Sequence, residues 1–143
     1  MPLAKLGGIN ISYKAEGQGE PLIMIMGFTA SRSGWVSQIP YFRKFYRVIT
    51  FDNRGAGKSD KPTGPYSTKM MAEDTVKLMD YLRIEKAHIM GASMGGMIAQ
   101  ELAILLVINF YTRFTGVFSD CLSKSATGTT ASFLTACTAS NKS

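Results

Sequence analysis

Short apolar runs, each of a length suited to one strand, constrain the fold of this chain more than any other feature. Pro21–Met26 is the clearest run, and Arg47–Phe51 and Ala87–Met90 are two more of the same kind. Such runs are typical of strands that are buried on both faces. Between the last two, Thr68–Leu82 has the apolar spacing of an amphipathic helix. Buried strands that alternate with helices predict an α/β fold, a mostly parallel sheet with flanking helices.

Two details extend this prediction. Ile9–Tyr13 is a further, shorter strand candidate, and the polar face of the predicted helix carries Glu73, Asp74 and Lys77. In parallel sheets, functional side chains gather in the loops at the carboxyl ends of the strands. The loops that follow the three apolar runs are therefore where a site is expected.

The composition of the chain changes near residue 103. Residues 1–101 hold 22 Lys, Arg, Asp and Glu, whereas residues 102–143 hold only 4. The last 25 residues contain 11 Ser or Thr and have no clear periodicity. This change indicates either two pieces of different origin or a domain followed by a disordered tail. We expect a folded domain over residues 1–103 and an unrelated, low-charge, Ser/Thr-rich, poorly ordered segment over residues 104–143.

Charge, cysteine and histidine content exclude several classes of protein. The net charge is +6, but the cations are scattered among acids, so no nucleic-acid partner is expected. The densest apolar stretch, Leu102–Phe110, falls short of the roughly 20 residues that span a bilayer, and no apolar run of signal-peptide length follows Met1–Gly8. We therefore expect a cytoplasmic protein without a membrane partner. Two Cys exclude a disulfide scaffold and a four-ligand zinc finger, and one His excludes a two-histidine metal site, so no metal site is expected.

The sequence Gly91-Ala92-Ser93-Met94-Gly95 lies directly after one apolar run and before the helical stretch Met97–Ala103. It is a G-x-S-x-G motif between a strand and a helix, the context in which a nucleophilic serine stands on a sharp turn. Glycines two residues to either side of the serine remove side chains that would collide there. The alternative is a glycine-rich turn in which Ser93 only caps the helix.

The loops after the other two runs carry weaker signals. Gly27-Phe28 follows the first strand, and its alternative interpretation is a plain loop leading into a helix around Trp35. Gly57-Lys58-Ser59 follows the second strand and superficially suggests a phosphate-binding loop. That motif requires a glycine where this chain has Asp52, a carboxylate in the place of the phosphate. The sequence therefore argues against an NTPase.

Taken in order, these motifs resemble the α/β-hydrolase superfamily, in particular its esterase and enol-lactonase-like branch. The resemblance covers about residues 1–103 and rests on Gly27-Phe28, on Asp52-x-Arg54-Gly-x-Gly-x-Ser, and on the motif around Ser93. It implies an N-terminal part of the α/β-hydrolase fold, with Ser93 as nucleophile and the backbone N–H groups of Phe28 and Met94 as oxyanion hole. It implies a small ester or lactone as substrate and no cofactor.

Other family features differ in this chain. Met26 stands where the family usually has His, and Asp52 and Arg54 belong to a loop that is mostly structural in the family. The family continues for more than a hundred residues, in which its catalytic acid and histidine lie. No triad acid or histidine is found here: His88 is interpreted as a strand-core residue with a satisfied ring, roughly 16 Å from Ser93, and no motif places Glu101 or Asp120.

Three hypotheses remain open for the function. The first is an inactive fragment or frame-shifted product of a serine hydrolase, truncated near residue 103. The second is a non-catalytic binding or interaction module on a partial hydrolase fold. The third is a short esterase that borrows a histidine by dimerising. The physical cost of a truncated sheet favours the first, since Ala87–Met90 is left as a bare apolar edge unless Leu105–Phe110 supplies a neighbouring strand.

Overall fold

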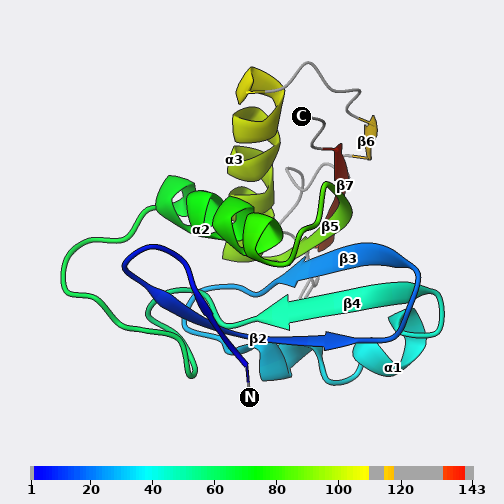
Figure 1. Cartoon of the computed structure of the whole chain (residues 1–143), viewed down its shortest axis with the longest axis horizontal. Helices are drawn as coiled ribbons and strands as arrows, with labels where there is room; N and C mark the ends of the chain where they lie inside the picture. The colour runs from blue at the N-terminus through cyan, green and yellow to red at the C-terminus, as the bar shows by residue number, and fades with distance from the viewer. Residues whose placement is uncertain (1, 110–114, 118–133, 141–143) are drawn as a thin grey trace, which may run out of the picture.

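Seven strands form one sheet in the computed structural model, which describes residues 2–109, 115–117 and 134–140 of the 143. The sheet order is β1-β2-β4-β3-β5-β7-β6. The strands are β1 (Leu3–Lys5), β2 (Asn10–Glu16), β3 (Glu20–Ile25), β4 (Tyr46–Phe51), β5 (Lys86–Ala92), β6 (Thr115–Val117) and β7 (Leu134–Ser140). In the centre, β3 pairs in parallel with both β4 and β5, and the outer pairs are antiparallel (Figure 1). The predicted α/β class is confirmed.

Each of the predicted strands is present, with ends that differ by a few residues. Ile9–Tyr13, Pro21–Met26, Arg47–Phe51 and Ala87–Met90 correspond to β2, β3, β4 and β5. The short strand β1 pairs with β2 in a hairpin and was not predicted, because three residues carry no periodicity.

Four helical segments connect the strands. They are the 3₁₀ turn η1 (Arg32–Trp35) and the helices α1 (Ile39–Phe42), α2 (Thr68–Tyr81) and α3 (Met94–Asn109). The first turn of α2 is capped by the Ser67 side chain, which accepts a hydrogen bond from the Met70 N–H at 3.1 Å. No helix in the described part of the chain is both long and apolar enough to cross a membrane.

Helix α3 corrects two expectations. The helix after Ser93 was predicted over Met97–Ala103 but runs from Met94 to Asn109, so residues 105–109 are helical and supply no strand. The free edge of β5 is instead covered by β7, which pairs with it in antiparallel register from Lys86 to Ala92. Strand β5 is therefore not the bare edge that the sequence predicted.

The prediction of a poorly ordered tail over residues 104–143 falls largely outside the described residues. Of that part of the chain, residues 104–109 continue α3, and residues 115–117 and 134–140 form β6 and β7. The proposed division at residue 103 stays a prediction.

The two faces of the sheet are covered unequally. Helices α2 and α3 pack on one face and bury the larger apolar cluster, to which Ile89 of β5 contributes. The other face carries a small cluster around Trp35, with Met90 and Ala92 of β5 packed at its margin and only half-buried. The two faces of β5 thus differ: Ile89 lies inside the larger cluster, whereas Met90 keeps contact with solvent.

Candidate active site

Ser93 stands on the sharp turn that joins β5 to α3. Its backbone φ is +54°, a left-handed conformation that among the described non-glycine residues is shared only with Thr29 and Arg83. A serine in this conformation is strained and persists only where the surroundings hold it. Its side chain is exposed, at the carboxyl end of a central strand.

The glycines around Ser93 are required by close backbone packing. A Cβ on Gly91 would overlap the backbone of Gly95, and a Cβ on Gly95 would overlap the Ile25 carbonyl of β3. A Cβ on Gly27 would lie 3.1 Å from the Ser93 Cβ and 3.6 Å from its Oγ. The loop after β3 and the turn after β5 are therefore in contact, as the sequence motifs predicted for a shared site.

Two backbone N–H groups predicted as oxyanion donors lie on these two segments. Met94 is the first residue of α3, and the first N–H groups of a helix have no partner within it. Phe28 lies in the loop between β3 and η1, and its side chain is 74% exposed. Its carbonyl accepts a hydrogen bond from the Thr29 hydroxyl at 2.8 Å. Thr29 itself has a strained backbone, with φ of +57°.

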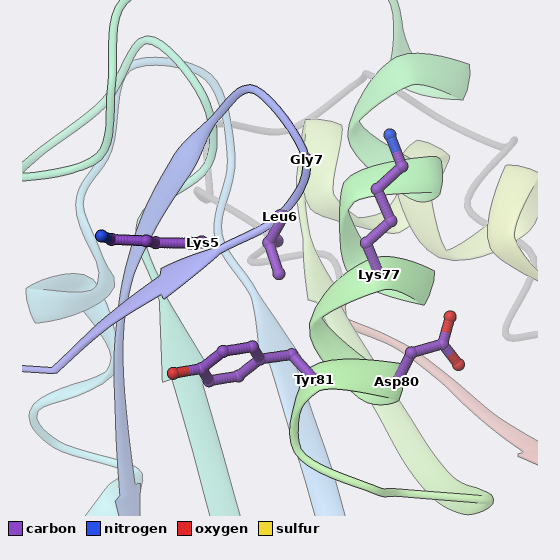
Figure 2. A pocket seen from close by; sticks show the side chains of 6 residues that line it. All are labelled: Lys5, Leu6, Gly7, Lys77, Asp80 and Tyr81. Carbon is purple, nitrogen blue, oxygen red and sulfur yellow. The ribbon is translucent and has the colours of Figure 1, made fainter.

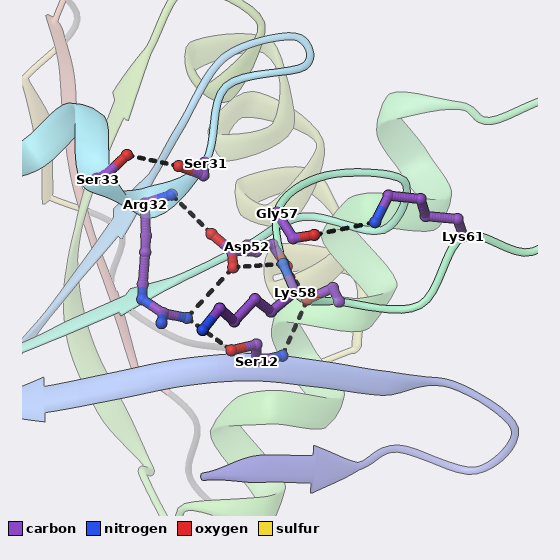
Figure 3. Close-up of polar contacts among 9 residues, drawn as sticks. Ser12, Ser31, Arg32, Ser33, Asp52, Gly57, Lys58 and Lys61 are labelled. Carbon is purple, nitrogen blue, oxygen red and sulfur yellow. Dashed lines mark hydrogen bonds and ion pairs between the residues drawn. The ribbon is translucent and has the colours of Figure 1, made fainter. Parts of the chain in front are cut away.

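Asp52, at the end of β4, is a buried structural carboxylate. It accepts hydrogen bonds from the backbone N–H groups of Arg32 at 2.7 Å and Lys58 at 3.0 Å, and it pairs with the Arg32 guanidinium at 3.3 Å (Figure 3). The Ser59 hydroxyl donates to the Asp52 carbonyl at 2.6 Å. A Cβ on Gly57 would collide with the Asp52 carboxylate, so this carboxylate fills the cradle that a phosphate would need.

Arg54 is held in the same loop by an ion pair to α2. Its Nε and Nη2 donate to the two carboxylate oxygens of Asp74 at 2.6 and 2.7 Å. The hydrogen bond to Asp74 raises the pKa of Arg54, so the guanidinium stays charged. The structural interpretation of Arg54 agrees with this geometry, but the placement of Asp74 on a solvated face was wrong: its side chain is 2% exposed because Arg54 neutralises it inside.

Asn53, between these two residues, was not singled out by the sequence. Its Nδ2 donates a hydrogen bond to the Met26 carbonyl at 2.9 Å. Its Oδ1 is buried and has no hydrogen-bond partner among the residues that the structure describes. Only the D-x-R-G motif pointed to this position, and the motif leaves the middle residue undefined.

His88 does not reach Ser93. Its Nε2 lies 2.9 Å from the Glu20 Oε2, and its ring packs edge-on against Tyr46, with ring centroids 5.3 Å apart. The hydrogen bond to His88 is the main cause that lowers the pKa of Glu20. The ring is satisfied, as predicted, but the side chain is about one-third exposed rather than in the strand core.

Of the two remaining acids considered as triad partners, only Glu101 lies in the described residues. Glu101 lies two turns along α3 and is half-buried, and Asp120 lies outside the described residues. Within the described ranges, no hydrogen bond joins the Ser93 hydroxyl to a carboxylate or an imidazole, and no cluster of three or more His, Cys, Asp or Glu forms a metal site.

Two grooves lie away from Ser93. The smaller, of about 380 Å³, lies between the β1 hairpin and α2 and includes Lys5, Lys77 and Tyr81 (Figure 2). The larger, of about 760 Å³, lies beside the Arg32–Asp52 pair (Figure 3). Among the cations that line it, Arg32 pairs with Asp52, and both Lys14 and Arg43 pair with Glu16.

Comparison with known proteins points to one family. The model described as the alpha/beta hydrolase fold matches residues 20–136, which includes Ser93 and passes the boundary predicted at residue 103. The 3-oxoadipate enol-lactonase 2 of Acinetobacter baylyi is 38% identical over 111 residues, covering 76% of this chain.

Solved structures agree. The enol-lactonase from Burkholderia xenovorans superposes with a TM-score of 0.70 and 32% identity over 71% of this chain. The meta-cleavage product hydrolase from Pseudomonas fluorescens gives a TM-score of 0.70 and 35% identity over 75% of this chain. The chain spans only 40–41% of the length of these three relatives.

Proposed function

The chain belongs to the α/β-hydrolase family, and from this premise we propose that it carries the nucleophile and oxyanion hole of a serine hydrolase. Ser93 is the nucleophile, and the N–H groups of Phe28 and Met94 are the oxyanion donors. The observation that carries the proposal is the left-handed turn at Ser93, with Gly27 packed against its side chain. A turn that stores strain to expose one hydroxyl beside two backbone donors serves nucleophilic attack better than it serves helix capping.

The reaction is acyl transfer through serine. The Ser93 Oγ attacks the substrate carbonyl carbon, and the oxyanion that forms accepts hydrogen bonds from the two N–H groups. The carbon–oxygen bond of the ester or lactone then breaks, the alcohol oxygen takes a proton, and water hydrolyses the acyl-serine. The chemistry needs no metal or organic cofactor.

The substrate is proposed as a small ester, a lactone or a related carbonyl compound. The names of the enol-lactonases support a lactone within this range.

The 143-residue chain by itself is proposed to be inactive. Attack by serine needs a base that takes its proton, and none of the described acids or the histidine is in reach of Ser93. Loss of the base from a triad costs roughly 10⁶-fold in kcat. A second polypeptide or an extension that supplies a family-like acid and histidine is expected to restore turnover.

Fluorophosphonate labelling of the purified chain tests this proposal. We expect slow adduct formation at Ser93, located by peptide mass spectrometry, and no turnover of a short-chain nitrophenyl ester. Ser93→Ala abolishes the adduct, whereas Ser37→Ala, at an exposed serine outside the turn, leaves it unchanged. Equal labelling in Ser93→Ala contradicts the assignment, and robust ester hydrolysis that is lost in Ser93→Ala shows that the chain holds a base after all.

A further inference from the structure

We infer that Asn53 is a positioning residue that fixes the loop from Met26 to Arg32 and so aims the Phe28 N–H at Ser93. The inference rests on the proposed function, since it assigns a role to the loop that carries one oxyanion donor. It also explains why the polar side chain of Asn53 is buried at this position.

The loop is held at both ends by two adjacent residues at the end of β4. At its start, the Asn53 Nδ2 donates to the Met26 carbonyl at 2.9 Å. At its end, the Asp52 Oδ1 accepts from the Arg32 N–H at 2.7 Å. Both holding residues are almost fully buried, at 3% and 2% exposure. The span of the loop is therefore set by two neighbouring residues that directly follow the central strand β4.

The hydrogen bond to Met26 acts on the geometry of the oxyanion donor. A peptide unit is planar, so fixing the direction of the Met26 carbonyl also fixes the Gly27 N–H, one residue before the Phe28 N–H. On the other side, the Met26 and Ile25 carbonyls lie against the backbone of Gly95. The loop is thus held between Asn53 and the turn that bears Ser93.

The strain inside the loop indicates that these contacts determine its shape. Thr29, directly after Phe28, is β-branched and adopts φ of +57°. This conformation is unfavourable for such a residue and persists only where the surrounding contacts impose it. Without the contact at Met26, Thr29 is free to relax, and the Phe28 N–H turns with it.

The side-chain amide of Asn53 contributes little to the stability of the fold. One end makes a good hydrogen bond, but the buried Oδ1 has no partner among the described residues, which offsets the gain. A leucine of similar size loses the bond to Met26 and also removes the unpaired oxygen. The reactivity of Ser93 and the stability of the fold are therefore expected to respond differently to Asn53→Leu.

The test is the rate of labelling of the full chain by a fluorophosphonate, followed by mass spectrometry. In this step the Ser93 Oγ bonds to phosphorus, the P–F bond breaks, fluoride leaves and the hydroxyl proton passes to solvent. In Asn53→Leu we expect the rate to fall about 10- to 100-fold, as for a misplaced oxyanion donor, with a melting temperature close to that of the unsubstituted chain. Asn10→Leu, which removes an amide that donates to Asp60 at 2.9 Å outside the loop, leaves the rate unchanged.

Asn53→Asp provides a rescue by a conservative variant. The carboxylic acid has the shape of the amide and can donate its O–H to the Met26 carbonyl, whereas the carboxylate repels that oxygen. The labelling rate relative to the unsubstituted chain is expected to approach one at acid pH and to fall as the new carboxyl ionises. The charged groups around it, Asp52 with Arg32 and Asp74 with Arg54, are present in both proteins and cancel in the ratio.

Three results overturn the inference. The first is an unchanged labelling rate in Asn53→Leu. The second is a labelling rate that falls only in proportion to the loss of stability, because Asn53 then has a structural role alone. If the unsubstituted chain gives no adduct at Ser93, the proposed function fails, and the loop is judged by hydrogen–deuterium exchange. Faster exchange confined to residues 26–32 in Asn53→Leu then supports the claim that Asn53 fixes this loop. Unchanged exchange rejects that claim.

Discussion

At the scale of single residues, the space beside the backbone determines which side chains fit in the turn around Ser93. Gly95 does not have a positive φ, so glycine is not required there by its backbone conformation. It is required because a Cβ would overlap the Ile25 carbonyl of β3. The G-x-S-x-G motif predicts a glycine at this position, but the carbonyl that Gly95 avoids lies on another segment of the chain, strand β3.

Gly95→Ala is therefore expected to destabilise the fold by about 1–3 kcal/mol or more, because a central strand cannot move away from the added methyl group. Urea unfolding measures the change. Gly8→Ala is the control. Gly8 has open space around it, so the added methyl group carries only the conformational cost of a positive φ (+104°), about 1–2 kcal/mol. A loss at Gly95 no larger than at Gly8 contradicts the close packing.

Glu20 predicts a dependence of stability on pH. Its pKa is lowered below 4.5, first by the hydrogen bond to His88 and then by the charges of His88 and Lys86. A lowered pKa in the folded state contributes stability above about pH 4.5, and this contribution is lost as the pH falls through the lowered value. The melting temperature of the unsubstituted chain minus that of Glu20→Gln is expected to shrink over this acid range.

Glu85→Gln is the matched control for this titration. Glu85 is exposed and makes no ion pair with a residue in the described ranges. Glu85→Gln removes one exposed negative charge, as Glu20→Gln does, but breaks no contact with His88. A parallel acid dependence in both variants assigns the effect to net charge and rejects the specific pair.

At the scale of elements, the periodicity of the sequence predicted the buried strands β2 to β5 and the helix α2. It failed at α3 because Ile104–Ile108 is a short run of branched apolar residues, which fits a buried strand as well as a buried helix. Contacts between distant segments had no local signal: Asp74 lies on the polar side of the helical pattern yet is buried, because its partner Arg54 comes from the loop after β4. Asn53 was missed for the same reason.

The Arg54–Asp74 pair joins that loop to α2, and its removal is expected to loosen both. Asp74→Ala leaves a largely buried guanidinium without its partner and is expected to cost about 3–5 kcal/mol of unfolding free energy. The double variant Arg54→Met with Asp74→Leu removes both charges and is expected to recover most of the loss. Urea unfolding of the unsubstituted chain, of the single variants Arg54→Met and Asp74→Leu, and of the double variant gives the coupling energy, and additive losses contradict a coupled buried pair.

At the scale of the whole molecule, the sheet is covered on one face and partly open on the other. Helices α2 and α3 lie over one face, whereas the opposite face is covered by η1 and α1 around Trp35. Near that second cluster, Met90 and Ala92 are half-buried, and Phe28 and Val36 are 74% and 69% exposed. The sequence predicted that the apolar edge of β5 would be exposed, but β7 covers that edge. The exposed apolar area therefore lies on the face of the strand.

Because apolar area is exposed at that face, the isolated chain is expected to bind an apolar dye such as anilinonaphthalene sulfonate and to self-associate with rising concentration. Met90→Lys places a charge on the half-buried face and is expected to weaken both effects, as measured by dye fluorescence and sedimentation. Ile104→Lys adds the same charge on α3, at a side chain that is 54% exposed, and is expected to leave both effects nearly unchanged. Dye binding that responds equally to both variants assigns it to net charge, and a monomeric chain that melts sharply and binds no dye contradicts an open apolar face.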